Sequence, residues 1–553
     1  MKSSSTHTRT KAVRGKTGNR SHLPDPTPLL LATDLEPKDV ARVLQAHSFQ
    51  DWQQADRNLQ AMAGEPATRK ALAIILPTLL ASLAETANPD QGLNEWERYA
   101  DSGIHRLQLF QYLANAPHIN DVLGTVFGNS PAMAQTLFRE PLLVYWIEDD
   151  RVLVRRQTRS KLLGTLENVQ EGVQSYDAKC EALRRFKRRE MLRLGIRDLL
   201  AIAKPIETYT VLSDLAAVVL QTAHDLVSQE LQRQHGYWES ADLTKGKNRI
   251  GLSVLAMGKL GGWELNYSSD VDLIYVYQAP ERMTESRKGQ EALSGSEYFH
   301  ALARELTNVL SVSTAEGALF RVDMRLRPEG EVGPLACSVE DACHYYQTRG
   351  RTWERLAFLK AKPIAGDLQI GRSFIRKLRP FVYGTREIAP QIFSEIQALR
   401  SQMVSKMKRR GELEHNVKLG IGGIREIEFI VQGLQLRWGY RYPGIRDRQT
   451  LKSLVKLVRV GKLKIGVLKQ LKASYIFLRD LENKIQMVHE LQTHLLPTKT
   501  EEIAKCAMRM RYPKRETTTQ TVEVFLRDYR EHTENVHYHY RKIVENVAVN
   551  EKM

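Results

Sequence analysis

Cysteine is scarce in this chain of 553 residues. Its four cysteines are Cys180, Cys337, Cys343 and Cys506, and no C-x-x-C pair occurs. A disulfide framework or a zinc ribbon needs cysteines at closer and more regular spacing. The sequence therefore predicts free thiols in a reducing compartment.

Long apolar runs are also absent. The most apolar segment, ALAIILPTLLASLA from Ala71, is shorter than the roughly 20 residues of a membrane helix and contains Pro77. We expect a buried, kinked helix there, no membrane span, and a cytoplasmic protein. The first acidic residue is Asp25, and the stretch before it lacks the apolar core of a secretory signal. We expect a disordered basic tail over residues 1–28, although its composition is shared with transit peptides.

Acidic residues are outnumbered, with 64 Asp and Glu against 81 Lys and Arg, a net charge of +17 and a pI of about 9.5. This balance favours an anionic partner, which can be nucleic acid, nucleotide phosphate or an acidic protein surface. A soluble protein that is merely basic fits equally. The length predicts two to four domains, at roughly 100–200 residues each.

The hydrophobic pattern is helical from about residue 35 to 203, at three- and four-residue spacing. Within it, residues 183–200 combine an apolar stripe with five basic residues, Arg184, Arg185, Lys187, Arg188 and Arg189. Two interpretations stay open for these side chains. They can form a solvated helical face or an electropositive docking surface.

The pattern changes at Arg249. Residues 249–330 predict a strand, a turn, a strand, a helix that Ser294 or Ser296 can cap, and a last strand over 319–328. The chain beyond this stretch is again helical, and no internal repeat occurs. The predicted fold is mainly α with a small α/β unit. The predicted parts are the tail 1–28, a helical region 29–245, a core 246–370 and a C-terminal helical domain 371–553.

Two carboxylates one residue apart precede the apolar run LIYVYQ. In a strand, Asp270 and Asp272 would point to one face, roughly 6.6 Å apart, while Val271, Leu273 and Tyr275 point into a core. Ionised carboxylates at this spacing repel each other unless a cation lies between them. Mg²⁺ is the expected cation, because it takes carboxylate oxygens together with substrate phosphates.

The last predicted strand adds a third carboxylate, Asp323, on the same face as Arg321, Arg325 and Arg327. Three carboxylates can hold two Mg²⁺ ions about 3.5–4 Å apart, the arrangement for in-line nucleotidyl transfer. The arginines can bind phosphate oxygens. A sheet edge with solvated alternating charge is the alternative.

Two other motifs are weaker. MGKLGG, residues 257–262, follows a strand but has neither P-loop nor dinucleotide-fold spacing, so a phosphate-binding turn and a plain tight turn both fit. His532, His537 and His539 suggest a metal, yet only His532 and His539 would share a helix face, which disfavours zinc.

These residues resemble the nucleotidyltransferase superfamily typified by DNA polymerase beta. Within it, the chain resembles the glutamine synthetase adenylyltransferase family over roughly residues 100–545. The resemblance rests on VLAMGKLGGWELNYSSDVDLIY, FRVDMRLRPEGEVGPL, GRTWERLAFLKAK, KLGIGGIREIEFIVQGLQL and LRRFKRREMLRLGIRDL. It implies a polymerase-beta-like core flanked by helical regions.

The resemblance also implies an activity. The family's enzymes typically carry two halves: one transfers AMP from ATP to a tyrosine of glutamine synthetase, and the other removes it by phosphorolysis to give ADP. Both use Mg²⁺ and respond to glutamine and the PII signal protein. This chain has a single D-x-D unit and resembles the N-terminal, adenylyl-removing half, which tends to carry S-S-D-x-D and GGIREIEF.

By position, the resemblance makes Asp270, Asp272 and Asp323 the metal ligands. Lys259, Ser269, Arg325 and Arg327 would approach the nucleotide or phosphate, and Glu428 would be a support residue or part of a buried ion pair. An adenylyltransferase that adds AMP, and a catalytically weak module that binds PII or glutamine synthetase, stay open as alternatives. The motifs disfavour a nucleic-acid partner.

Overall fold

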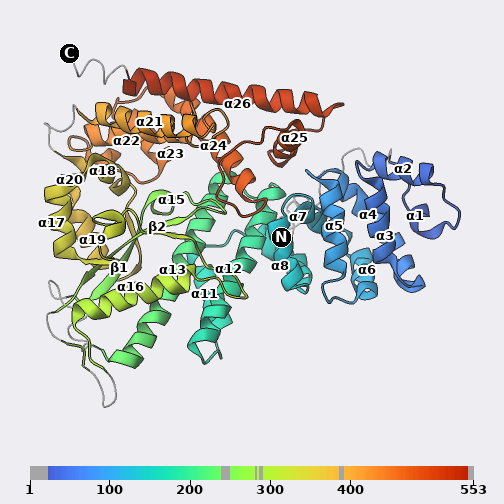
Figure 1. Ribbon diagram of the computed structural model, residues 1–553, viewed down its shortest axis with the longest axis horizontal. Helices are drawn as coiled ribbons and strands as arrows, with labels where there is room; N and C mark the ends of the chain where they lie inside the picture. The colour runs from blue at the N-terminus through green and yellow to red at the C-terminus, as the bar shows by residue number, and fades with distance from the viewer. Residues whose placement is uncertain (1–22, 238–248, 281–282, 286–290, 385–390, 546–553) are drawn as a thin grey trace, which may run out of the picture. The chain divides into compact units, whose positions relative to one another are not determined.

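The computed structural model describes residues 23–237, 249–280, 283–285, 291–384 and 391–545. The protein is mainly helical and contains one small mixed sheet, which confirms the predicted fold class (Figure 1). Contacts divide the chain into two compact units. Unit 1 comprises residues 1–156, 188–208 and 480–527, and unit 2 comprises residues 157–187, 209–479 and 528–553. The four-part division of the sequence stays a prediction, and most of its predicted tail lies outside the described residues.

Prolines begin most of the helices in unit 1. Proline suits the first helical position because its φ is preset and the missing N–H would have no intrahelical partner. The helices with this start are α1 (Pro28–Leu31), α2 (Pro37–Ala46), α4 (Pro66–Ala84), α5 (Pro89–Ala100), α7 (Pro117–Phe127) and α8 (Pro131–Arg139). The others confined to this unit are α3 (Trp52–Ala63), α6 (Arg106–Asn115), α9 (Leu143–Glu148), α10 (Asp150–Val154) and α25 (Thr500–Arg509).

The core of unit 1 lies around three aromatic side chains. Trp96 and Tyr99 of α5 pack against Phe127 of α7, with ring centroids 5.4 and 5.5 Å from that of Phe127. Helix α4 runs through Pro77 and begins at Pro66, earlier than predicted. Within the described residues it alone is long and apolar enough to cross a membrane, so the length argument against a span was wrong. Because 56% of its apolar window is buried, α4 is a core helix of this unit.

Unit 2 contains the sheet, in the order β3-β2-β1-β5, with β4 also paired to β2. Strand β1 is antiparallel to β2 and β5, whereas β3 and β4 run parallel to β2. The strands are β1 (Gly251–Ala256), β2 (Val271–Gln278), β3 (Val322–Asp323), β4 (Ala336–Ser338) and β5 (Lys362–Gly366). The sequence did not predict β4 and β5, which are short and lack a run of alternating residues.

Helices surround this sheet in Figure 1. Those confined to unit 2 are α11 (Arg159–Gln170), α15 (Gly258–Gly261), α16 (Gly295–Ser311), α17 (Val339–Arg349), α18 (Thr352–Phe358), α19 (Leu368–Lys377), α20 (Arg379–Tyr383), α21 (Ile392–Arg409), α22 (Ile424–Trp438) and α23 (Thr450–Arg459). Short turns of other helix types are η4 (Gly330–Val332), η6 (Pro443–Ile445) and η7 (Arg541–Glu545). Helices α12 (Tyr176–Leu199), α13 (Pro205–His235), α24 (Ile465–Gln486) and α26 (Thr518–Tyr540) have residues in both units.

Strand β2 is anchored by its aromatic residues. Tyr277 stacks on Phe299 of α16 at 5.3 Å, and the hydroxyl groups of Tyr275 and Thr307 lie 3.2 Å apart. Ser294 caps α16 in a capping box with Glu297, as one of the two predicted caps. Because side chains alternate along a strand, the face of β2 opposite these tyrosines carries Asp272.

Candidate functional site

The strand register places two carboxylates side by side. Strands β2 and β3 pair in parallel with Val271 opposite Val322 and Asp272 opposite Asp323. Neighbouring strands lie about 4.8 Å apart, and paired residues of parallel strands point to the same face. Asp272 and Asp323, which are 51 positions apart in the sequence, therefore form one acidic patch.

The chain turns immediately after Asp323, so the predicted strand over 319–328 was wrong beyond the two residues of β3. The turn is local: Asp323 Oδ1 accepts a hydrogen bond from the backbone N–H of Arg325 at 2.9 Å. The Arg325 guanidinium then closes back on the same carboxylate, with Nη2 2.5 Å from Oδ2. The Arg327 guanidinium donates to three backbone carbonyls, those of Gly333, Met324 and Glu331. Arg325 thus lies at the acidic patch, whereas the guanidinium of Arg327 braces the turn.

Asp270 lies just before β2 rather than within it, so strand alternation does not set its direction. Its carboxylate accepts a hydrogen bond from Nε of Arg321 at 2.9 Å. The same guanidinium donates to the hydroxyl of Ser268 at 2.9 Å. Two of the three predicted metal-ligating carboxylates are therefore paired with arginines.

A glycine turn lies directly against the Asp272 carboxylate. Gly258 begins α15 with φ +49°, and a Cβ on it would fall 2.2 Å from Asp272 Oδ2. Glycine is needed at this position both for its backbone conformation and for the close approach. The next residue, Lys259, extends Nζ to within 3.4 Å of the Ser269 hydroxyl. The structure thus brings these two predicted nucleotide-contacting side chains together.

The electrostatics of the patch follow from these neighbours. Burial, and then the adjacent Asp323 carboxylate, raise the pKa of Asp272 to about 6. The hydrogen bonds from Arg325 hold the pKa of Asp323 below its ordinary value. Lys418 and Arg425 act in the opposite sense on the pKa of Asp272, lowering it.

Lys418 and Arg425 were not among the predicted site residues. Both belong to the KLGIGGIREIEF motif, which the resemblance used only to select Glu428. The sequence does carry a signal for them, because the two cations flank the glycines of this motif, Gly420, Gly422 and Gly423. Both cations oppose the rise in the pKa of Asp272, so this segment acts electrostatically on the acidic patch.

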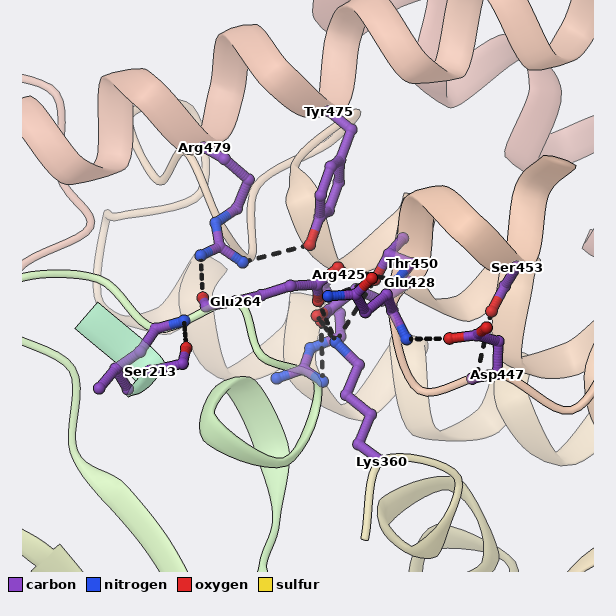
Figure 2. Close-up of polar contacts among 12 residues, drawn as sticks. Ser213, Glu264, Lys360, Arg425, Glu428, Asp447, Thr450, Ser453, Tyr475 and Arg479 are labelled. Atoms are coloured by element: carbon purple, nitrogen blue, oxygen red, sulfur yellow. Dashed lines mark hydrogen bonds and ion pairs between the residues drawn. The ribbon is translucent and has the colours of Figure 1, made fainter. Parts of the chain in front are cut away.

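Glu428 of α22 lies in a buried charge cluster with Glu264 and Lys360, which Figure 2 shows. Lys360 Nζ lies 2.9 Å from Glu428 Oε1 and 3.1 Å from Glu264 Oε2. Thr450 donates to Glu264 through its backbone N–H at 2.8 Å and through its hydroxyl at 3.1 Å. Of the two roles considered for Glu428, the structure shows the buried ion pair.

The acidic patch has the donor chemistry of a Mg²⁺ site, since carboxylate oxygens are what this ion prefers. Within the described residues, however, no three His, Cys, Asp or Glu side chains converge closely enough to hold a metal. Arg321 and Arg325 hold Asp270 and Asp323 in their present positions. The patch can bind a divalent cation through Asp272 and Asp323 once the guanidinium of Arg325 moves from its carboxylate.

The three histidines of α26 diverge. His532 Nδ1 lies 3.2 Å from the Ser474 hydroxyl and His537 Nδ1 lies 3.1 Å from Glu426 Oε2, while His539 faces the Gln470 amide oxygen at 2.7 Å. Each ring has a separate partner.

The basic segment of α12 is only partly a surface. Arg184 is buried and donates to the backbone carbonyl of Val309 at 3.0 Å, so placing it on a solvated or docking face was wrong. Arg188 pairs with Glu140, and the guanidinium of Arg189 lies 4.9 Å from the Trp146 ring centroid. Much of this charge serves internal contacts within the two units.

Comparison with known proteins places two family models on the chain. Residues 121–377 match a family described as glutamate-ammonia ligase adenylyltransferase, and residues 394–544 match one described as GlnD PII-uridylyltransferase. The first match contains the whole sheet, β1 to β5, with the acidic patch. The second contains α22 and Glu428.

Curated relatives are described as bifunctional glutamine synthetase adenylyltransferase/adenylyl-removing enzymes. The protein from Nitrosococcus oceani is 39% identical over 418 residues, which covers 74% of this chain and 42% of the relative. Those from Thioalkalivibrio sulfidiphilus and Rhizobium meliloti are 36% and 40% identical, over 77% and 59% of this chain and 42% and 32% of the relatives. The chain thus spans about two-fifths of the length of the first relatives.

Proposed function

Because the chain belongs to the glutamate-ammonia ligase (glutamine synthetase) adenylyltransferase family, we propose that it is a Mg²⁺-dependent nucleotidyltransferase that acts on glutamine synthetase. The observation that carries the proposal is the pairing of Asp272 with Asp323 on adjacent parallel strands, beside the Gly258 turn. The S-S-D-x-D and GGIREIEF motifs favour the adenylyl-removing direction. The substrate is then an adenylylated tyrosine of glutamine synthetase, and the products are the free tyrosine and ADP.

The proposed step is in-line attack of inorganic phosphate on the phosphorus of the tyrosine-bound AMP. A new P–O bond to phosphate forms as the P–O bond to tyrosine breaks, and the tyrosine oxygen takes a proton. Mg²⁺ held by Asp270, Asp272 and Asp323 would offset the negative charge on the phosphate oxygens. Two ions are expected, since in-line nucleotidyl transfer of this kind uses a pair of divalent cations.

The chain's own cations take the remaining roles in this proposal. Arg325 lies at the carboxylate of Asp323, where it can turn to a phosphate oxygen. Lys259 lies in the glycine turn, and Ser269 immediately precedes Asp270. Their side chains lie 3.4 Å apart, so both can contact a nucleotide bound at the acidic patch. Arg327 was also predicted to contact phosphate, but its three carbonyl contacts give it a positioning role in the turn.

Paired assays test the direction of transfer. In the first, the chain is incubated with adenylylated glutamine synthetase, Mg²⁺ and phosphate, and ADP is measured. In the second, unmodified glutamine synthetase is incubated with labelled ATP and Mg²⁺. We expect ADP in the first assay. We expect Asp272→Asn to reduce its formation roughly 100-fold or more, whereas Asp225→Asn, a change at an exposed residue of α13, should not.

The assays also decide between the alternatives. Label transferred only in the second assay would make the chain an adenylyltransferase that adds AMP from ATP. Product in neither assay would make it a regulatory module. The match of residues 394–544 to a model described as GlnD PII-uridylyltransferase supports PII as a further partner. A cytoplasmic location is part of the proposal, because glutamine synthetase would be reached there.

A further inference from the structure

Unit 1 contains a cavity of about 400 Å³ that shares no residue with the acidic patch. All of its lining residues belong to this unit. They come from the C-terminal end of α4, from α7 and the residues after it, from the end of α12, and from the end of α25 with the segment that follows. Ligand sites in proteins are commonly cavities of roughly 300–1,000 Å³. The size of this cavity therefore suits a small molecule.

Three basic residues that line the cavity, Arg509, Arg511 and Lys514, come from one segment at the end of α25. Arg509 Nε donates to the carbonyl of Asn129 at 3.1 Å, near the end of α7. Arg511 Nη2 donates to the carbonyl of Asp198 at 2.6 Å, in the last turn of α12. Each guanidinium thus satisfies a carbonyl at a helix C-terminus, where carbonyls lack intrahelical partners and cations are favoured.

These anchoring bonds leave most of the donors unused. A guanidinium has five N–H donors, and among the described residues Arg509 uses only the one on Nε. Its terminal amino groups are not sealed from solvent, and burial lowers the pKa of this half-buried guanidinium. Lys514 Nζ donates to the Ser48 hydroxyl at 2.7 Å. Within the part of the chain that the structure describes, neither cation forms an ion pair with a carboxylate. Partly buried cations without a carboxylate partner favour an anion in the cavity.

The side of the cavity formed by α4 and α7 has a different chemistry. The hydroxyl groups of Ser82, Thr86 and Thr125 donate to backbone carbonyls three or four residues earlier, at 2.7 to 2.8 Å. A hydroxyl whose proton is used in this way can only accept a further hydrogen bond. Two carboxylates, Glu85 and Asp121, also line the cavity, and each has a partner of its own. This side therefore offers acceptors, which match the hydroxyl groups of a ligand.

The turn that carries the arginines is strained. Arg511 has φ +68°, in the left-handed region. Its N–H donates to the carbonyl of Met508 at 2.8 Å, and the N–H of Tyr512 donates to the carbonyl of Ala507 at 3.0 Å. This is the hydrogen-bond pattern of a Schellman motif, in which glycine is the usual residue at the left-handed position. An arginine at this strained position is the kind of outlier that occurs at ligand sites.

We propose that the cavity binds a sugar phosphate, either free or as part of a nucleotide. Arg509, Arg511 and Lys514 would hold the phosphate group, and the acceptors of α4 and α7 would hold the sugar hydroxyls. A phosphate monoester carries a charge of about −1.5 to −2 and three terminal oxygens, so it matches three cations better than a carboxylate does. A bare phosphate ion would leave most of the cavity empty. The site belongs to unit 1 alone, so it does not depend on the proposed function.

The competing interpretation is that the three cations only cap helix ends and that water fills the cavity. Calorimetry on the full chain separates the two, with a chelator present to prevent metal-dependent binding at the acidic patch. The probes are ribose 5-phosphate and AMP, and ribose and adenosine are their counterparts without phosphate. We expect saturable binding of at least one phosphorylated probe, at least tenfold tighter than binding of its counterpart. Hydrogen exchange should show added protection in peptides from α25 and residues 510–515 when the probe is bound.

Variants locate the binding. We expect Arg509→Met to weaken it at least tenfold and Arg509→Lys, which keeps the charge, by a smaller factor. Arg511→Asn removes the second guanidinium but suits the left-handed backbone, so it should fold and bind at least threefold more weakly. The matched control, Arg57→Met, removes an exposed arginine of α3 outside the cavity and should bind as the wild type does. Circular dichroism and the melting temperature establish that each variant is folded.

The outcomes separate the two sources of the ligand as well. Binding of both probes, or of ribose 5-phosphate alone, supports a site for free sugar phosphates, and binding of AMP alone supports a site for a nucleotide. If neither probe binds, or if Arg509→Met and Arg511→Asn bind as the wild type does, the three cations only cap helix ends and the inference is wrong. Where Arg509→Met does not fold, unchanged binding by Arg509→Lys together with unchanged binding by Arg511→Asn would overturn it.

Discussion

Removing the buried ammonium of Lys360 should destabilise unit 2 in a pH-dependent way. Lys360→Met keeps most of the side-chain volume but removes the cation between Glu264 and Glu428. Burial opposes the charged form of Lys360, yet the two glutamates outweigh it and raise the pKa of Lys360. At neutral pH the wild-type ammonium is therefore charged, and the variant leaves two buried carboxylates without it.

The size of the loss follows from the contacts that remain. Breaking a buried ion pair by removing one partner costs about 3–5 kcal/mol. Arg425 still lies 3.3 Å from Glu428, and Thr450 still donates two hydrogen bonds to Glu264. We therefore expect the lower end, about 3 kcal/mol at pH 8. Lys360 lowers the pKa of Glu428 in the wild type, so in the variant this pKa rises, the carboxyl takes up a proton at a higher pH, and the penalty shrinks as pH falls.

Hydrogen–deuterium exchange with peptide resolution is a suitable assay, because the chain has two units and a single unfolding transition is not expected. Peptides from β5 and α22 should lose protection in Lys360→Met, and peptides from α4 in unit 1 should not. Lys469→Met, at an exposed position of α24, is the control and should change stability by less than about 0.5 kcal/mol. Equal losses at pH 8 and pH 5 would show that packing rather than charge was removed, and no loss would refute the reasoning.

Three further predictions concern other parts of unit 2. The hydrogen bond to Glu426 raises the pKa of His537 above 6.5, so its contribution is complete below that pH and is lost as pH rises through the raised value. His537→Gln should lower the local stability of α26 by about 1 kcal/mol at pH 6 and by little at pH 8, measured by hydrogen exchange of peptides from this helix; the figure is small because the ring is 35% exposed. Asp272→Asn should reduce turnover roughly 100-fold or more with no loss of melting temperature, because it relieves repulsion from Asp323; a large destabilisation with retained turnover would contradict the site. Gly258→Ala would place a methyl group against Asp272 in a strained backbone conformation, so both turnover and stability should fall, the latter by about 1 kcal/mol or more, and unchanged kinetics would count against the geometry.

The sequence predicted the elements whose signal is local. The aspartates before an apolar run marked the start of β2, and the spacing of apolar residues with a serine cap marked α16. In both cases the pattern and the capping chemistry lie within one element. Asp323 was found in the same way, because alternation does hold at Val322 and Asp323.

Alternation failed beyond Asp323 because the polar side chains there have local partners. In the sequence, Arg325 and Arg327 continue the period of two that began at Arg321. In the structure, Arg325 folds back on Asp323, and Arg327 binds carbonyls of its own turn. An alternating run of arginines does not distinguish a strand from a turn. In both structures the guanidinium N–H groups can find acceptors, so the sequence pattern is the same.

The cluster around Lys360 could not be predicted by spacing at all. Glu264 comes from the segment after α15, Lys360 from the turn between α18 and β5, and Glu428 from α22, and no period joins them. Each would be expected on the surface if taken alone, because charged residues are rarely buried without a partner. Their joint burial also explains why the sequence did not identify Arg425 as part of this cluster. Only when the two glutamates are seen to share Lys360 does a second cation become necessary, and Arg425, 3.3 Å from Glu428, supplies that charge.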